Sequence, residues 1–242
     1  MSASILFLKG DIILSIIFEN IIKVIERYWP LFLTGLGYTL LLSLVTVIFG
    51  AILGLFVAIM KMSKVTMFKI KPLSFLASLY IEIIRGTPLL LQLYFFYFLL
   101  PMLIPALELN KFVCIAVALV FNSSGYVAEI IRAGIGAVDK GQTEAARSLG
   151  LNSGQTMKKI IIPQAVKNIL PALVNEFVMV IKETSLASTF FVGDLMTQYK
   201  IVSGALYLVI EPLIIIGIIY LIVTYSLSKG AAVIERGLKV SE

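Results

Sequence analysis

The sequence predicts an all-α integral membrane protein, and three observations support this prediction. Of the 242 residues, 60% are hydrophobic and 14% are charged, and the mean hydropathy is +1.02. Soluble domains are closer to about half apolar and about a quarter charged. The apolar residues lie in runs of about 20 or more, which is the length that a helix needs to cross a bilayer. Lysines and arginines gather in a few loops between these runs, so the net charge of +6 indicates membrane orientation rather than nucleic-acid binding.

Five segments are expected to cross the membrane as helices: residues 31–60, 72–100, 112–131, 169–190 and 206–228. The motif RGTP at residues 85–88 interrupts the second of them. Residues 1–30 mix Ile and Leu with charged side chains, so we expect an interfacial amphipathic segment there, with a sixth span as the alternative. Residues 31–228 then form the transmembrane domain, and residues 229–242 form a tail.

The distribution of basic residues predicts which side of the membrane each loop faces. Thirteen lysines and arginines lie in residues 61–71, 132–167 and 229–239, whereas five lie in the loops on the opposite side. Loops rich in Lys and Arg stay in the cytoplasm. Five spans therefore place the N-terminus outside and the C-terminus inside, with the long loop of about residues 133–168 in the cytoplasm.

Several kinds of chemistry are not expected of this chain. Histidine is absent and Cys114 is the one cysteine, so we predict neither a disulfide within the chain nor a metal site. No GxxxxGK[ST] loop is present, so the chain itself is not expected to hydrolyse a nucleotide. A membrane-embedded enzyme would have few groups to work with, and the sequence favours transport.

The cytoplasmic loop has a predicted structure of its own. Asp139 can cap a short helix over residues 142–149, and Gly150 suits the turn that ends it. Asn152 or Ser153 can cap a second helix that runs to Ile162, and Pro163 either interrupts the helical hydrogen bonds or opens the fourth span. The expected result is a helix, a sharp turn and a helix. Two interpretations remain: a docking surface for another protein, and an amphipathic connector that lies on the lipid headgroups.

The same loop carries a resemblance to a known family. Residues 144–163 read EAARSLGLNSGQTMKKIIIP, which resembles the EAA loop of the membrane subunits of binding-protein-dependent ABC importers, with the pattern EAA-x3-G-x9-I-x-L-P. Six positions match: Glu144, Ala145, Ala146, Gly150, Ile160 and Pro163. Ile162 stands where the pattern has Leu. Residues 80–95, 122–135 and 163–186 look like the polar amino-acid uptake permeases within that family.

The resemblance implies partners and a location. It implies a second permease subunit (an identical copy or a close paralogue), two ABC ATPase subunits that hold ATP and magnesium, and an extracytoplasmic amino-acid-binding protein. The chain itself would need no cofactor and would lie in the cytoplasmic membrane of a prokaryote. The first helix of the loop would be a coupling helix that sits in a groove of the ATPase. The residues implied in coupling are Glu144, Ala145, Ala146, Arg147 and Gly150.

The break in the second span is one candidate substrate site. Charge inside a span is costly and indicates function. Glu82 and Arg85 are three residues apart and can pair along one helix. The helix is expected to break just after them, because Pro88 has no N–H and restricts Thr87. Arg85 and nearby N–H groups could hold the carboxylate of an amino acid, and Glu82 could hold its ammonium group. A purely structural kink is the alternative.

Two further groups of polar residues lie in the spans. Asn122 lies near the middle of the third span with Tyr126 one turn away, and a cavity lining is favoured there over an interhelical hydrogen bond. In the fourth span, Asn175 and a Lys-Glu-Thr-Ser stretch cluster toward the outer half. Glu183 and Ser185 belong to that stretch, and the resemblance implies substrate contact or gating for them.

The acids in the spans outnumber the bases. The acids are Glu82, Glu129, Glu176, Glu183 and Glu211, and the bases are Arg85, Lys182 and Arg132. Glu129 and Arg132 are expected to pair with each other. If the remaining carboxylates line a cavity, a cationic amino acid such as arginine, lysine or histidine is favoured. The family resemblance implies the transmembrane subunit of an ATP-driven importer of polar amino acids that works by alternating access, and the charge balance adds the expectation of basic substrates above others. The alternative is an ion-coupled secondary transporter or channel for small polar solutes.

Overall fold

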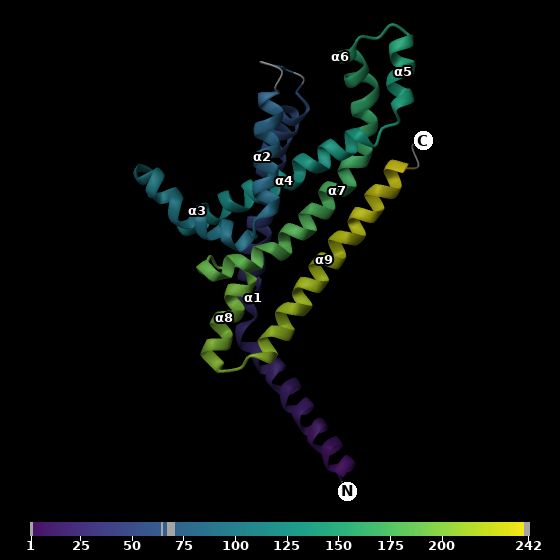
Figure 1. Cartoon of the computed structure of the whole chain (residues 1–242). Coiled ribbons are helices and arrows are strands. Elements are labelled where there is room, and N and C mark those ends of the chain that lie inside the picture. The colour runs from purple at the N-terminus through teal and green to yellow at the C-terminus, as the bar shows by residue number, and fades with distance from the viewer. Residues whose placement is uncertain (1, 64, 67–70, 240–242) are drawn as a thin grey trace. The chain divides into compact units, whose positions relative to one another are not determined.

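The computed structural model describes residues 2–63, 65–66 and 71–239, and every regular element within these ranges is a helix (Figure 1). Side chains are described for residues 12, 14–63, 65–66, 71–233 and 236. The chain forms two compact units. The first contains Met1–Leu41 and Lys182–Tyr225, and the second contains Leu42–Ile181 and Ser226–Glu242.

Helix α1 (Ser2–Met62) runs without interruption through the predicted N-terminal segment and the first predicted span. Pro30 lies inside it, where it removes one backbone donor from the helix. Thr34 Oγ1 donates to the carbonyl oxygen of Pro30 at 2.8 Å. The boundary expected near residue 30 is therefore not a break in the helix. The interfacial position of residues 1–30 stays a prediction, and the side chains of residues 1–11 and 13 lie outside the described set.

The second predicted span is a pair of helices, α2 (Pro72–Gly86) and α3 (Leu89–Leu103), whose axes differ by 109°. The break predicted at the RGTP motif is confirmed. Between the helices, Thr87 is extended with φ −118° and ψ 147°. The ring of Pro88 disfavours a helical conformation in the residue before it, which explains why α2 ends there.

Helix α4 (Lys111–Gly136) meets its neighbours in the second unit through glycines. A Cβ on Gly54 of α1 would lie 2.7 Å from Val127 Cβ, and one on Gly125 would lie 2.7 Å from Ile84 Cγ2. Small residues at such points let helices approach closely in a membrane, where lipid provides no hydrophobic drive for their association. The apolar core at this crossing consists of Val57, Ala58, Ala77, Ile81, Val127, Ala128 and Ile131.

The predicted cytoplasmic loop folds as a helical hairpin, and Figure 1 shows its two arms, α5 and α6, side by side. Asp139 caps α5 (Lys140–Ser148) by accepting a hydrogen bond from the backbone N–H two residues on, at 2.8 Å. The helix ends in a Schellman turn, in which Leu151 N donates to the Ala146 carbonyl at 3.1 Å. Gly150 has φ +85°, a conformation that residues with a Cβ rarely adopt. The predicted cap, helix and glycine turn are confirmed.

The second arm begins with a capping box, in which Asn152 and the glutamine three residues on exchange side-chain and backbone hydrogen bonds. The arm consists of α6 (Ser153–Thr156) and a π-helical turn (Met157–Ile161), and it continues directly into α7 (Ile162–Glu183). Pro163 lies just after the π-helical turn, within a helix that is continuous from Ser153 to Glu183. Of the two roles predicted for this proline, the structure shows the interruption: the regular hydrogen-bond ladder changes to a π-helical turn just before Pro163, and no new helix begins there.

The first unit contains a 3-10 helix (Thr184–Phe190), α8 (Leu195–Leu206) and the start of α9 (Ile210–Lys239). Asp194 caps α8 by accepting from a backbone N–H at 3.0 Å. Thr39 Oγ1 on α1 accepts from the first amide of α8, also at 3.0 Å. The apolar core of this unit consists of Val24, Phe32, Leu195, Val202, Ile215 and Ile216.

By length and composition, four helices of the described residues can cross a membrane, or up to five if the bent pair α2–α3 counts as one span. The four are Leu14–Met62, Lys111–Gly136, Ser153–Phe190 and Ile210–Val233. The number five and the orientation stay predictions. The bounds of these helices differ from the expected spans. The fifth span, for example, was expected from residue 206, but α9 begins at Ile210 because Tyr207, with φ +56°, interrupts the helix.

Candidate functional site

The break in the second span is held by side chains that replace missing backbone hydrogen bonds. Thr87 Oγ1 donates to the carbonyl oxygen of Ile83 at 2.8 Å. The carbonyl of Ile84 has no backbone donor four residues on, because that residue is Pro88. Gln92 Nε2 donates to the Ile84 carbonyl oxygen instead, at 2.7 Å. The broken helix therefore keeps the carbonyl groups of Ile83 and Ile84 hydrogen-bonded.

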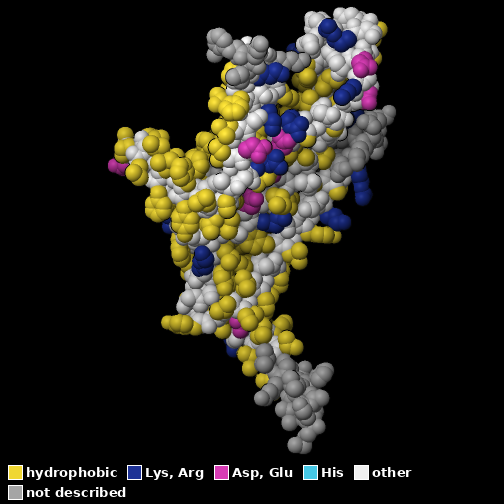
Figure 2. Space-filling model, viewed as in Figure 1, with side chains coloured by type: hydrophobic (Ala, Val, Ile, Leu, Met, Phe, Trp, Pro, Cys, Tyr) yellow, Lys and Arg dark blue, Asp and Glu magenta, His cyan; other side chains and the backbone are white. Residues whose placement is uncertain are grey.

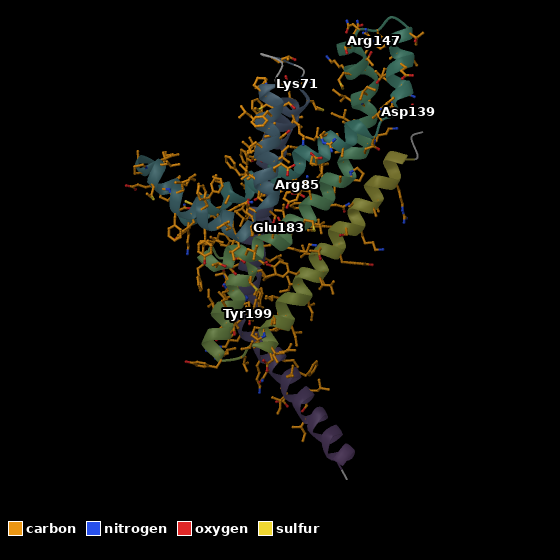
Figure 3. The ribbon with its side chains drawn as sticks, viewed as in Figure 1. Lys71, Arg85, Asp139, Arg147, Glu183 and Tyr199 are labelled. Atoms are coloured by element: carbon orange, nitrogen blue, oxygen red, sulfur yellow. The ribbon has the colours of Figure 1, made fainter. Side chains whose placement is uncertain are left out.

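Helix α4 contacts the break at two points one turn apart. Asn122 Nδ2 donates to Gln92 Oε1 at 2.8 Å, and these two side chains are only 3% and 7% exposed. The Arg85 guanidinium carbon lies 5.5 Å from the centroid of the Tyr126 ring, a cation–π distance. Figure 3 shows Arg85 on α2, near the break. The interhelical hydrogen bond of Asn122, which the sequence favoured less than a cavity lining, is present in the structure. Contact of Asn122 with a substrate stays a prediction.

Two predicted ion pairs have different outcomes. Glu129 accepts hydrogen bonds from Arg132, its predicted partner, and also from Lys61 Nζ at 3.2 Å. Glu82 and Arg85 form no ion pair in the described part of the chain, and both are exposed. Arg85 lies over an aromatic ring instead, which leaves Glu82 accessible to a ligand or a partner.

The remaining acids predicted in spans also have different surroundings. Glu211, at the start of α9, accepts from Asn20 Nδ2 at 3.0 Å. Glu176 on α7 accepts from Ser123 Oγ at 2.9 Å. Within the described residues, Glu176 makes no ion pair. The sequence counted Glu176 among the acids but did not select it for the site, because spacing along α7 does not show that this carboxylate faces α4.

Three other predicted site residues lie on α7 and the turn after it. Asn175 is exposed on α7 in the second unit. Glu183 ends α7 and Ser185 lies in the following 3-10 helix, and both are half-buried in the first unit. The role predicted for these three residues in substrate contact or gating stays a prediction.

An apolar cavity of about 400 Å³ opens beside the break. Its walls come from α2, α3 and α4 and include Tyr80, Thr87, Gln92, Phe95 and Phe121. The outer surface of α3 is also apolar, and Figure 2 shows hydrophobic side chains covering this arm. Such a lining suits hydrocarbon better than the charged ends of an amino acid.

The α5–α6 hairpin exposes most of the residues implied in coupling. Glu144, Ala145 and Arg147 are exposed, and Figure 3 places Arg147 near the tip of the hairpin. Ala146 was expected to form part of a small contact face for another protein, but it is 4% exposed. Its carbonyl accepts the hydrogen bond of the Schellman turn. Leu149, which the sequence reasoning did not select, is 84% exposed. An apolar residue after a short polar helix could have indicated it.

Comparison with known proteins identifies the family of the chain. Residues 50–240 match the family described as binding-protein-dependent transport system inner membrane component. The arginine transport system permease protein ArtQ of Bacillus subtilis is 42% identical over 213 residues, which are 88% of this chain and 94% of that protein. A Rickettsia bellii protein named for glutamine transport, GlnP, is 42% identical over 225 residues, which are 93% of this chain and 100% of that protein.

A solved structure agrees with these relatives. The crystal structure of an amino acid ABC transporter with histidines contains a chain that is 47% identical, with a TM-score of 0.81. The alignment covers 88% of the present chain and 97% of the solved one. The fold, the family match over most of the length and the full coverage of the relatives point to one conclusion. This chain is a multi-pass membrane protein of the binding-protein-dependent transport family, a permease subunit of an amino-acid ABC transporter.

Proposed function

We propose that this permease subunit imports basic amino acids, such as arginine, lysine or histidine, by alternating access. The observation that carries the proposal is the Glu176 carboxylate, which lies in the candidate span Ser153–Phe190 and accepts a hydrogen bond from a serine hydroxyl. A carboxylate inside a span is costly unless a partner compensates its charge. A cationic substrate would supply that partner during transport.

Comparison with Glu129 strengthens the argument. Glu129 also lies in a candidate span, but Lys61 and Arg132 both donate to it, so a cationic ligand has little to gain there. Glu176 has a hydroxyl donor and no cation among the described residues. Glu82 is exposed and outside any described ion pair, and we propose it as a second acidic contact beside Arg85 and Thr87. The other proposed substrate contacts are Asn122, Tyr126 and Asn175 in the second unit. In the first unit they are Glu183 and Ser185.

Relatives support the basic class without deciding it. One is named for arginine transport, and the solved structure is described as that of an amino acid ABC transporter with histidines. Another relative of equal identity is named for glutamine. Glutamine is therefore the competing substrate. An ion-coupled secondary transporter is not favoured, because the family depends on binding proteins.

The proposed assembly follows the family. A second permease copy or close paralogue pairs with this chain, two ATPase subunits bind ATP and magnesium on the cytoplasmic side, and an amino-acid-binding protein docks outside. Five spans place the N-terminus outside and the C-terminus inside the cytoplasmic membrane of a prokaryote. The exposed face of the α5–α6 hairpin, with Glu144, Ala145, Arg147 and the Gly150 turn, contacts the ATPase.

Binding of radiolabelled arginine and glutamine to the purified permease–ATPase complex, without the binding protein, tests the substrate class. We expect arginine to bind at least about tenfold more tightly than glutamine, because only arginine has a cationic side chain that can pair with the Glu176 carboxylate. Glu176→Gln keeps an acceptor for Ser123 but removes the charge, so it should reduce arginine affinity about tenfold and leave glutamine affinity unchanged.

The matched control is Glu19→Gln, which removes an exposed carboxylate that pairs with Lys23 on α1. This control should leave both affinities at the wild-type value. Equal affinity of the wild-type complex for arginine and glutamine would contradict the basic preference. Arginine affinity unchanged in Glu176→Gln would remove Glu176 from the substrate path.

A further inference from the structure

We infer that Gln92 is a positioning residue of the substrate site, which holds the break in the second span in the geometry that presents Arg85 to the substrate. The inference rests on the proposed function, in which Arg85 is a substrate contact. Gln92 itself is 7% exposed and is not proposed to touch the substrate.

The first step is the missing donor. In an uninterrupted helix the Ile84 carbonyl would accept from the N–H of residue 88, but Pro88 has none. Gln92 Nε2 takes that place, at 2.7 Å from Ile84 O. The same nitrogen lies 2.8 Å from Thr87 Oγ1 and 3.2 Å from Thr87 O. One side-chain amide thus binds both the last turn of α2 and the extended residue after it.

The second step is the anchor of that amide. Gln92 Oε1 accepts from Asn122 Nδ2 on α4 at 2.8 Å, and Asn122 is 3% exposed. The amide nitrogen and the amide oxygen of Gln92 therefore both have hydrogen-bond partners. The nitrogen donates to residues at the break, and the oxygen accepts from the buried Asn122. An apolar side chain at residue 92 would leave the Ile84 carbonyl and the Asn122 amide without these partners in a place that water does not reach.

The third step connects the anchor to Arg85. Tyr126 lies one turn after Asn122 on α4, and its ring faces the Arg85 guanidinium at 5.5 Å. Between them, Gly125 allows Ile84 so close that an added Cβ would lie 2.7 Å from Ile84 Cγ2. Residues 122–126 of α4 therefore contact Ile84 and Arg85 before the break and Gln92 after it. The direction of α2 at Arg85 depends on the Gln92–Asn122 hydrogen bond as well as on the glycine contact.

The substitution Gln92→Leu tests this role in the full complex with its ATPase and binding protein. The readouts are the apparent KM and maximal rate of ATPase stimulation by arginine and by glutamine, the basal ATPase rate, and the Tm of the complex. We expect Gln92→Leu to raise the KM for the stimulating amino acid at least about tenfold. Gln92→Glu keeps the acceptor for Asn122 but loses the donors, so it should give a smaller increase in KM.

A second-site change separates positioning from stability. Pro88→Ala restores a backbone N–H, so the double variant Pro88→Ala, Gln92→Leu can satisfy the Ile84 carbonyl by closing the helix. We expect it to recover the Tm lost in Gln92→Leu while the KM stays high, because the break is gone. The control is Leu103→Ala, an exposed residue at the far end of α3, which should leave the KM unchanged.

Two results would overturn the inference: a wild-type KM in Gln92→Leu, or recovery of both Tm and KM in the double variant. The second result would make Gln92 a stabilising residue only. These outcomes are distinct from a failure of the proposed function. If glutamine stimulates the ATPase and arginine does not, the basic preference is wrong, but the KM for glutamine still reports on Gln92.

Discussion

The α5–α6 hairpin and the break between α2 and α3 are both departures from a plain membrane helix, yet different kinds of hydrogen bond hold them. In the hairpin, Asp139 bonds the amide two residues on, and Asn152 bonds the amide three residues on. At the break, local bonds from Thr87 and Gln92 are joined by a bond from Asn122 to Gln92 across 30 residues of sequence. The contact of Tyr80 with the Ser124 hydroxyl spans 44 residues. The hairpin is thus stabilised locally, and the break depends on the packing of α4.

This difference implies different consequences of mutation. A hairpin that is stabilised by its own hydrogen bonds can move as a rigid body when a bound partner subunit moves. A break whose geometry depends on a neighbouring helix changes when that helix moves. Coupling between an ATPase and a membrane site needs both kinds of element. A rigid contact transmits the movement, and a segment with two alternative conformations changes from one to the other in response.

The largest expected effect comes from the hairpin turn. Gly150 has φ +85°, where a β-branched residue is strained by about 1–2 kcal/mol or more. Gly150→Val should therefore distort the hairpin and nearly abolish uptake, while the permease still reaches the membrane and the ATPase keeps its basal rate. Vesicle uptake and ATPase assays on the same preparation measure this. Gly150→Asn is the control, because asparagine tolerates the left-handed conformation, and it should keep most uptake. Wild-type uptake in Gly150→Val would contradict the coupling role.

The next effect concerns the exposed tip of the hairpin. Leu149 is 84% exposed, and an apolar contact with the ATPase would bury it. We expect Leu149→Asp to reduce co-purification of the ATPase about tenfold, as measured by subunit stoichiometry on size-exclusion chromatography. Leu149→Met keeps the apolar surface and should behave as wild type. Unchanged stoichiometry in the aspartate variant would show that the ATPase binds elsewhere.

Sequence reasoning succeeded where the bonds are local. The cap at Asp139, the turn at Gly150 and the cap at Asn152 follow from residue type and spacing, and the structure confirms each of them. The break at RGTP was also predictable, because Pro88 acts on its own neighbours.

Sequence reasoning failed where a partner lies on another helix. Nothing in the spacing shows that Lys61 reaches Glu129 or that Glu176 faces Ser123. Gln92 could have been noticed as the one amide in the apolar run LLLQLYFFYFLLPML, but its role depends on Asn122. Side-chain direction across helices depends on the packed fold, which periodicity leaves undetermined.

A pair of double-mutant cycles tests the contrast between the two regions directly. At the break, Gln92→Leu and Asn122→Leu remove two sides of one buried hydrogen bond, so their effects on unfolding free energy should be non-additive by about 0.5–3 kcal/mol. In the hairpin, Asp139→Ala and Asn152→Ala remove separate caps with no shared partner and should add within about 0.5 kcal/mol. Chemical denaturation of the purified complex in detergent measures both cycles. Additivity at the break would contradict the long-range network.

The smallest expected effect is that of one cap. Asn152→Ala removes the capping box of α6, and loss of such a cap costs about 1 kcal/mol. Because the rest of the hairpin is held by its own Schellman turn and by the Asp139 cap, the Tm of the complex should fall only by a few degrees, and uptake should stay above half of the wild-type rate. Asn152→Ser, which retains a capping oxygen, should restore the wild-type Tm. If Asn152→Ala instead abolished uptake, the hairpin would depend on its membrane neighbours as much as the break does, because a locally stabilised hairpin tolerates the loss of one cap.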